Sequence, residues 1–256
     1  MRVSRRAGGA WLAALMAPLM ATLMTSAAAQ MTLRGGTPEG LPGYGLGPQG
    51  ELRIDSPPKA ALLRCVEQAL NVRIVWQAYP TRRVLQMLAE QQLDLAFPMG
   101  FNEERAARLR QSEAGWDNPD VWVSLRPVQV QDKGLRLGAR LGSPQHDDHL
   151  GQGYARVVGA VTYEELAKLL LRDMVDVVIL PRSVHADMQA LWPAGHLVSE
   201  GKPRRSGFYL PKADPQQLGG PLDQAIRRCR AVNAPAASRP HSNAAVDPTA
   251  ARANAA

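Results

Sequence analysis

Residues 79–113, YPTRRVLQMLAEQQLDLAFPMGFNEERAARLRQSE, carry the pattern around which the rest of the chain is arranged. Leucines and a valine at helical spacing predict a helix over residues 82–91, and an apolar run predicts a buried strand over 93–98. A loop containing Gly100 follows, and a second helix is expected to begin at Asn102. This order is half of a βαβ unit, in which ligands bind beyond the carboxyl ends of the strands.

The loop after the predicted strand holds the most informative polar residues. Asn102 can cap the following helix, and two glutamates suit the positive end of its dipole. Arg105 does not suit the first turn, because a cation there is unfavourable by about 0.3–1 kcal/mol. An anion held jointly by the guanidinium and the free helix N–H groups would compensate. The alternative is an exposed arginine paired with a nearby glutamate.

The segment resembles lobe 1 of the family 3 extracellular solute-binding proteins, the periplasmic components related to amino-acid ABC importers. The resemblance implies that Arg105 holds a ligand carboxylate, with Asn102 in place of the family's capping threonine and Gly100 in the same binding loop. It also implies an α/β, two-lobe periplasmic-binding-protein-like (type II) fold with two hinge crossovers. The residues that carry it are Pro80, Arg83, Leu88, Asp94, Asn102, Glu103, Glu104, Arg105, Ser112 and Glu113.

Residues 1–29 are expected to be a secretory signal peptide. Three arginines form its charged beginning, Trp11–Met24 its apolar stretch, and Ala27–Ala29 a small-residue cleavage site. A single transmembrane anchor is the alternative, but Pro18 interrupts the short apolar stretch. Cleavage near Ala29 predicts a periplasmic protein, and a lipoprotein is not expected because no cysteine follows the site directly.

The formal charge of the 256-residue chain is +7, and it falls to +4 once the three arginines of residues 1–29 are removed. The basic residues are scattered, and no aromatic-interleaved patch is typical of a nucleic-acid face. The charge therefore favours a small anionic ligand and solubility. We expect a monomer without a nucleic-acid partner.

The chain contains two cysteines, Cys65 and Cys229. An even count is compatible with one disulfide in an oxidising compartment. Each cysteine also lies within the apolar pattern of a predicted helix, so two buried free thiols remain the alternative. A disulfide would join the first helix of the mature chain to the last.

Two segments of the chain follow one plan. Leu88 stands six residues before Asp94, and Leu170 stands six residues before Asp176; each aspartate opens an apolar strand that ends at a proline. Two lobes of similar plan, or one larger α/β domain with a repeated unit, would both produce this pattern. The family resemblance favours two lobes. It predicts lobe 1 at 30–128 plus 207–232, lobe 2 at 129–206, and a disordered tail at 233–256.

Other elements are predicted from spacing and cap residues. An extended run over 121–130 is interpreted as the first crossover between lobes. Thr162 and Glu165 form a capping box that opens a helix, and Ser183 is expected to cap another. Further elements are a strand at 31–36, a helix from Pro57 to Leu70 stopped by Asn71, strands at 72–76, 135–140 and 157–161, and a last helix at 216–232.

The resemblance also implies positions for the second half of a binding site. The turn Gly142–Ser143 matches the lobe 2 turn whose hydroxyl and N–H groups meet the ligand, and Tyr44 is a candidate lid. A tyrosine that packs on its own segment is the alternative for Tyr44. Pro181 replaces the aspartate that receives an α-amino group in relatives, so an anion seen by Arg105 and Arg182 fits better than an ordinary amino acid.

Catalytic and metal-binding patterns are weak in this sequence. His146 and His149 stand three apart within His146–Asp147–Asp148–His149, as two metal ligands on one helix face would. A polar loop entering a helix has the same appearance, and no further cysteine or histidine is tied to it. His185 and His196 have no partner identifiable from sequence. We therefore expect no metal, no cofactor and no enzymatic activity.

These observations together predict a periplasmic, two-lobed protein that closes on a small carboxylate-type anion and serves an ABC-importer permease or a sensor. Two alternatives remain. One is an accessory protein that has lost small-molecule binding and contacts a protein partner. The other is a small dehydratase or hydrolase on the same scaffold.

Overall fold

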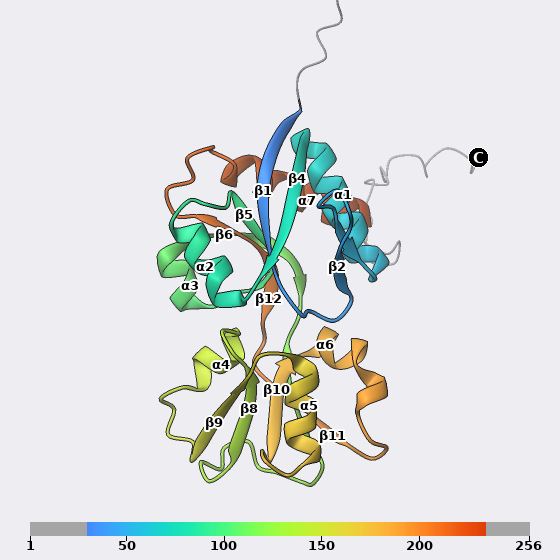
Figure 1. The fold of residues 1–256 in the computed structure, drawn as a ribbon, viewed down its shortest axis with the longest axis vertical. Helices are drawn as coiled ribbons and strands as arrows, with labels where there is room; N and C mark the ends of the chain where they lie inside the picture. The colour runs from blue at the N-terminus through green and yellow to red at the C-terminus, as the bar shows by residue number, and fades with distance from the viewer. Residues whose placement is uncertain (1–29, 234–256) are drawn as a thin grey trace, which may run out of the picture.

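The computed structural model describes residues 30–233, and these form two lobes, each built on a five-stranded sheet (Figure 1). The predicted signal peptide and nearly all of the predicted tail lie outside the described residues. The lobe 1 sheet has the order β4 (Val72–Tyr79), β1 (Met31–Pro38), β5 (Leu95–Gly100), β12 (Arg205–Pro211), β6 (Leu109–Asp117). The lobe 2 sheet has the order β11 (Leu197–Glu200), β7 (Asp120–Ser124), β10 (Val177–Pro181), β8 (Arg136–Arg140), β9 (Arg156–Ala160).

Helices cover the sheets of both lobes. In lobe 1, α1 and α7 lie together near one face and α2 and α3 lie toward the other (Figure 1). A short hairpin of β2 (Tyr44–Leu46) and β3 (Leu52–Ile54) packs beside α1. The lobe 1 helices are α1 (Pro57–Leu70), α2 (Thr81–Ala89), α3 (Glu103–Arg108) and α7 (Gly219–Asn233). The lobe 2 helices are α4 (Pro144–His149), α5 (Tyr163–Leu171), α6 (Arg182–Asp187) and a 3-10 turn, η1 (Gln189–Leu191). No helix within residues 30–233 is long and apolar enough to cross a membrane.

Three helix ends are formed by the residues that the sequence predicts. Asn71 adopts a left-handed conformation and ends α1. The side chain of Asn102 accepts the backbone N–H of Arg105 and caps α3. Thr162 and Glu165 form the complete capping box of α5. Each contact satisfies backbone groups that a helix end would otherwise leave free.

The chain passes between the lobes at two adjacent segments. It leaves lobe 1 after β6 and enters lobe 2 at β7, then returns between β11 and β12. The two passages are hydrogen-bonded to each other, because the N–H of Asn118 donates to Arg204 O and that of Asp120 donates to Lys202 O. Such a short paired connection can act as a hinge.

The first crossover lies earlier than the predicted border at residue 128. Strand β7, within the predicted crossover at 121–130, belongs to the lobe 2 sheet, where Val123 pairs with Val178. All five of its residues are buried, so its apolar run marks a core strand and not a connection. Strand β6, at residues 109–117, was not predicted, because its mixed composition hides its pairing with β12.

The cap of α6 differs from the prediction. Helix α6 begins directly after Pro181, so Ser183 lies inside its first turn. The N–H of Ser183 donates to Asn118 Oδ1 at 3.1 Å, and the N–H of Arg182 donates to Pro119 O at 2.8 Å. The crossover itself therefore caps α6, which a local reading of the sequence could not show.

The repeated Leu–Asp spacing corresponds to one construction present in both lobes. Asp94 Oδ2 accepts the N–H and Nε of Arg34 on β1, while its own N–H donates to Arg34 O. Asp176 makes the same three contacts with Arg136 on β8. In each lobe this closed ring of contacts fixes the register between two parallel strands.

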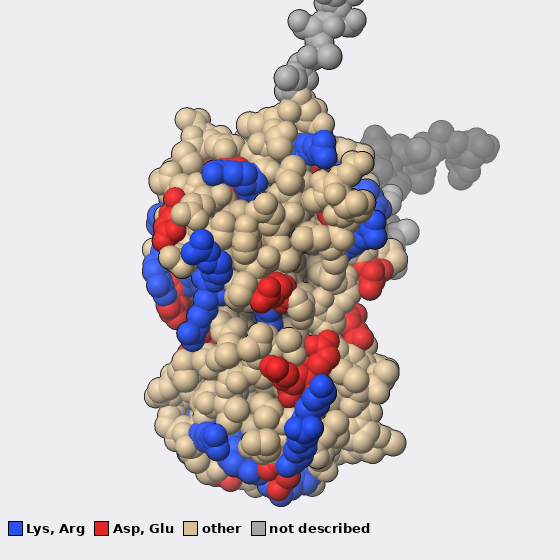
Figure 2. Space-filling model, viewed as in Figure 1, with Lys and Arg blue, Asp and Glu red and all other residues tan. Residues whose placement is uncertain are grey.

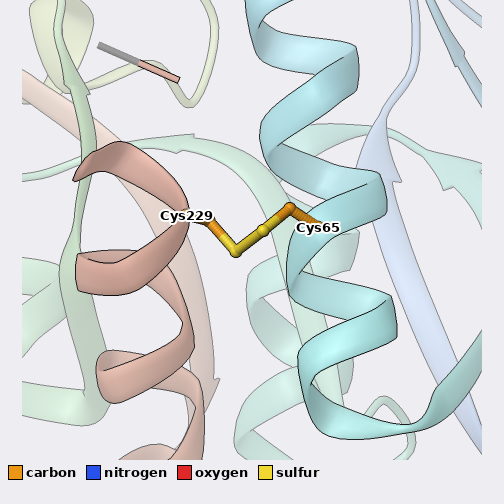
Figure 3. The surroundings of a disulfide bond; sticks show 2 residues. All are labelled: Cys65 and Cys229. Atoms are coloured by element: carbon orange, nitrogen blue, oxygen red, sulfur yellow. A yellow bond between two sulfur atoms is a disulfide. The ribbon is translucent and has the colours of Figure 1, made fainter. Parts of the chain in front are cut away.

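The Cys65–Cys229 disulfide joins α1 to α7 (Figure 3). The two cysteines are separated by 164 positions in sequence, and their Cα atoms lie 5.8 Å apart. Of the two alternatives left open by the sequence, the structure contains the bridge. It links the first helix of lobe 1 to the helix that closes the fold.

We expect the double variant Cys65→Ala/Cys229→Ala to lose about 2–5 kcal/mol of unfolding free energy, since the bridge restricts the unfolded chain. Urea unfolding followed by circular dichroism measures the loss. Reducing the wild-type protein should produce a similar shift. Equal stability of the oxidised, reduced and variant proteins would contradict the assignment.

Asp176→Asn should lower stability at pH 7 by about 1.5–3 kcal/mol, because hydrogen bonds to a charged group are lost. The hydrogen bond from Arg136 holds the pKa of Asp176 well below its usual range, although burial opposes this shift. The stabilisation is therefore present above about pH 4 and disappears as the pH falls further.

The wild-type and Asp176→Asn unfolding curves should thus converge in acid. Asp173→Asn is the matched control, because Asp173 contacts the same guanidinium at 3.1 Å but its side chain is 75% exposed. That variant should change stability by less than about 1 kcal/mol. A pH-independent difference for Asp176→Asn would contradict the linkage.

Candidate functional site

A crevice of about 70 Å³ lies between the two lobes. Its lobe 1 wall includes Gly100 at the end of β5 and Trp116 on β6; its lobe 2 wall includes Arg140 at the end of β8 and Pro181 at the end of β10. Three of these residues lie at carboxyl ends of strands, where α/β proteins place their ligands. The volume is far below the roughly 300–1,000 Å³ of a typical small-molecule pocket, so little free space remains between the lobes.

Arg105 lies in this crevice and is 4% exposed. Its Nη1 donates to Gly100 O at 3.1 Å, and its Nη2 donates across the crevice to Gly142 O at 2.6 Å. The carboxylate nearest to it is Asp147, at 3.5 Å from Nη2. Burial lowers the pKa of Arg105, and Asp147 opposes that shift. The alternative of an exposed arginine paired with a glutamate is therefore wrong.

Arg140 lines the crevice from lobe 2 and was not predicted as a site residue. It is 4% exposed and donates to three neutral oxygens: Thr81 Oγ1 at 2.9 Å, Glu39 O at 2.5 Å and Val161 O at 3.2 Å. Among the described residues, no carboxylate oxygen lies within 4.0 Å of its guanidinium. The only sequence signal was an arginine ending an apolar strand directly before the Gly142–Ser143 turn.

The predicted turn of lobe 2 reaches the crevice. Gly142 has a positive φ of 68°, which suits glycine, and its carbonyl accepts from Arg105. Ser143 lines the crevice, but its Oγ caps α4 by accepting the N–H of His146 at 3.2 Å. Ser143 therefore lies at the crevice, and its hydroxyl already has one partner.

Tyr44 lines the crevice and also packs against the lobe 1 core. Its position is therefore compatible with a lid over the crevice and with packing against its own lobe. Burial raises the pKa of Tyr44, and the charge of Asp187 adds to the effect. The ammonium of Lys59 lies 5.9 Å from its ring centre and 5.4 Å from that of Trp116. Lys59 and Asp187 also attract each other electrostatically.

Arg182 does not line the crevice, contrary to the prediction. Its side chain is 46% exposed and forms an ion pair with Glu200 on β11. The chain places it there because α6 starts at residue 182, and its first turn directs this side chain toward the neighbouring edge strand. The candidate residues that the structure brings together are Arg105, Ser143, Gly100 and Tyr44; Asn102 supports them by capping α3.

A buried ion network stands where the crevice meets the crossovers. Arg204, 6% exposed, donates Nε and Nη2 to Asp120 at 3.1 and 2.9 Å, and Nη2 also reaches Asp148 at 2.9 Å. Its Nη1 donates to Phe101 O in lobe 1 at 2.7 Å. Burial alone would lower the pKa of Arg204, but Asp120 and Asp148 together raise it. Figure 2 shows acidic side chains around the narrowed middle of the molecule on the face in view.

Two residues of the His146–His149 motif contact other groups of the protein. Asp148 forms an ion pair with Arg204, and His149 Nδ1 contacts Gln145 O at 2.7 Å. His146 is buried, with Nδ1 3.7 Å from Asp147. Within residues 30–233, no group of three or more His, Cys, Asp or Glu side chains is arranged to hold a metal ion.

No protein-family model and no curated protein matches this sequence. Solved structures, however, are similar over about four fifths of the chain. An ancestral arginine-binding protein bound to glutamine has a TM-score of 0.62 and 20% identity, covering 78% of this chain and 92% of its own. Holo ArgBP from T. maritima has a TM-score of 0.63 and 16% identity, covering 78% and 90%.

A third similar structure is the ancestral amino acid-binding protein AncCDT-1, a precursor of cyclohexadienyl dehydratase. Its TM-score is 0.62 and its identity 14%, with 78% of this chain and 89% of that chain covered. At these identities the similarity establishes the fold, which is the two-lobe, periplasmic-binding-protein-like fold expected from the sequence.

Arg204→Met should lower the unfolding free energy by about 3–5 kcal/mol, because Asp120 would keep a buried charge without its partner. Lys202→Met is the matched control. Lys202 contacts the same Asp148 oxygen at 3.0 Å, but its side chain is 62% exposed. Its loss should cost less than about 1 kcal/mol. Chemical denaturation at constant pH compares the two, and similar losses would contradict the role assigned to burial.

Proposed function

We propose that this chain is an exported solute-binding protein of the family 3 type, which captures a small carboxylate-bearing anion between its lobes. It would deliver the anion to a membrane permease or present it to a sensor. The observation that carries the proposal is the pair of buried guanidinium groups, Arg105 from lobe 1 and Arg140 from lobe 2, that line one crevice.

The charge balance of the crevice favours an anion. Arg204 is neutralised by Asp120 and Asp148, whereas Arg140 has only neutral acceptors and Arg105 has one carboxylate at 3.5 Å. A buried cation without a close counter-charge is costly. A carboxylate between the two arginines would supply that charge and charge-assisted hydrogen bonds.

Unsatisfied hydrogen-bond donors at the same place also support a ligand. Arg105 Nε and Trp116 Nε1 are buried and have no hydrogen-bond partner among the described residues, and both residues line the crevice. Buried donors normally have partners. Oxygen atoms of a ligand would accept from them. Both donors belong to lobe 1, which would therefore bind the anion first.

Binding requires the lobes to separate at the paired crossovers. In the closed form Gly142 O and Asp147 occupy the side of Arg105 that a ligand would use. An entering carboxylate would replace these two groups, and the lobes would close again around it. Hinge closure of this kind is the usual way in which two-lobe proteins enclose a small molecule.

The class of ligand is inferred from the acidic side chain that lines the crevice. Asp187 is the one carboxylate among the described lining residues, and the charge of Lys59 attracts it electrostatically. The similar structures include proteins bound to arginine and to glutamine, whose ammonium groups need an acidic partner. Because Lys59 partly balances the charge of Asp187, and Pro181 offers no charge, a carboxylate without an ammonium group suits this crevice better.

A second candidate function is a binding-deficient accessory protein that contacts a protein partner. The observation that favours it is the small closed crevice in which Arg105 is already bonded across the lobes. In that case the Arg105–Gly142 contact would be a permanent latch. Ligand screening separates the two functions.

The test is a thermal-shift screen of mono- and dicarboxylates, amino acids, phosphates and sugars against the mature chain. A carboxylate that binds the folded state should raise the melting temperature in a concentration-dependent manner. Arg105→Ala should abolish the shift, and Arg140→Gln should weaken affinity by about tenfold or more, since each removes a charge-assisted contact of about 1.5–3 kcal/mol.

Arg108→Ala is the control for Arg105→Ala. Arg108 lies one turn further along α3, is exposed, and pairs with Glu104 on the surface. It should bind as the wild type does. No shift with any compound would favour the accessory function, and chemical conversion of a bound compound, seen by mass spectrometry, would indicate an enzyme.

A further inference from the structure

Two histidines for which the sequence suggested no partner face each other in lobe 2. His185 lies on α6, and His196 precedes β11. Their Nε2 atoms are 3.0 Å apart, and both side chains are partly exposed. Neither residue lines the crevice between the lobes. The pair is therefore independent of the function proposed above.

The protein determines which ring nitrogens carry protons. His196 Nδ1 lies 3.0 Å from Pro193 O, and a carbonyl oxygen can only accept, so this nitrogen carries the proton. His196 Nε2 is then a free lone pair that accepts the Nε2–H of His185. A backbone carbonyl that holds Nδ1–H and presents Nε2 is the arrangement found behind metal-binding histidines.

Trp192 supports the His185 ring. The indole of Trp192 stacks on the His185 ring with 5.7 Å between ring centres and 22° between the planes. The indole Nε1 of Trp192 donates to the backbone oxygen of His185 at 3.3 Å, so the indole is attached to α6. Trp192 is itself buried in the lobe 2 core. Trp192 thus supports the His185 ring from the lobe 2 core, and both imidazoles remain partly exposed to solvent.

We propose that His185 and His196 bind one first-row transition-metal ion through their Nε2 atoms, with Cu²⁺ as the ion best matched, and that solvent completes its coordination. Bonds of about 2.0–2.1 Å place two neighbouring nitrogens of a square-planar ion about 2.9 Å apart, and those of a tetrahedral ion about 3.3 Å apart. The observed separation of 3.0 Å is that of the hydrogen bond between the two rings, so each ring must turn before both lone pairs face one ion. Cu²⁺ is preferred because it binds imidazole nitrogens most strongly among the divalent first-row ions.

Metal binding changes which nitrogen of His185 carries the proton but leaves both imidazoles neutral. The Nε2 proton of His185 moves through solvent to Nδ1 of the same ring, and the two Nε2 lone pairs then form the metal–nitrogen bonds. The neighbouring cation is Arg182, whose charge is compensated by its ion pair with Glu200. The site therefore does not repel a divalent ion as an unpaired arginine would.

The experiment titrates the mature full-length chain with a copper(II) salt, in the presence of a weak competing chelator that removes loosely held metal. Isothermal titration should show one saturable site. Electron paramagnetic resonance of the loaded protein should show coupling to two nitrogen nuclei. His185→Gln and His196→Gln should each lower the affinity by about tenfold or more, since even indirect partners of a metal site cost 10–100-fold.

His149→Gln is the matched control. This histidine is also partly exposed and also contacts a backbone carbonyl through Nδ1, yet it has no second imidazole nitrogen facing its ring in the described chain. It should bind copper as the wild type does. Circular dichroism checks that each variant is folded. Unchanged affinity in both His185→Gln and His196→Gln, or a spectrum without two nitrogen couplings, would overturn the proposal.

Discussion

The structure depends on one buried ion pair, between Arg204 and Asp120, at the place where the chain passes between the lobes. Asp120 is 1% exposed and begins the first strand of lobe 2, while Arg204 precedes the strand that returns to lobe 1. Since an isolated charge in such a position is costly, the two passages must remain side by side. The guanidinium also bonds Phe101 O, so both lobes are oriented from the same point.

A second buried arginine, Arg140, lines the same crevice but has different hydrogen-bond partners. Arg204 has two carboxylates, whereas the guanidinium of Arg140 donates to a hydroxyl and two carbonyl oxygens and lies 5.4 Å from the ring centre of Tyr163. A network that is complete within the protein stabilises the hinge. The Arg140 guanidinium has only neutral acceptors, and this difference is the basis of the anion site proposed above. The same residue type therefore stands in two different electrostatic environments within one crevice.

The two lobes repeat one construction and differ at their edges. The Arg34–Asp94 and Arg136–Asp176 rings of contacts set equivalent strand registers in the two sheets. The segments after the aspartate-led strands differ, because β5 leads into the loop that carries Arg105, whereas β10 leads directly into α6. Lobe 1 therefore contributes a cation to the crevice from a helix start. Lobe 2 contributes Arg140 from the end of β8. His185, on α6 of the same lobe, lies outside the crevice.

The sequence by itself determined many of the elements and the lobe 1 arginine, because caps, apolar spacing and the Leu–Asp repeat are local properties of a few residues. Asn102, Thr162 and the β5 strand could be predicted for this reason. Tertiary structure alone decided that β7 belongs to lobe 2, that Arg140 lines the crevice and Arg182 does not, and that His185 meets His196. These depend on strand pairing and on contacts between distant segments, and no local pattern encodes which surfaces will face each other once the chain has folded.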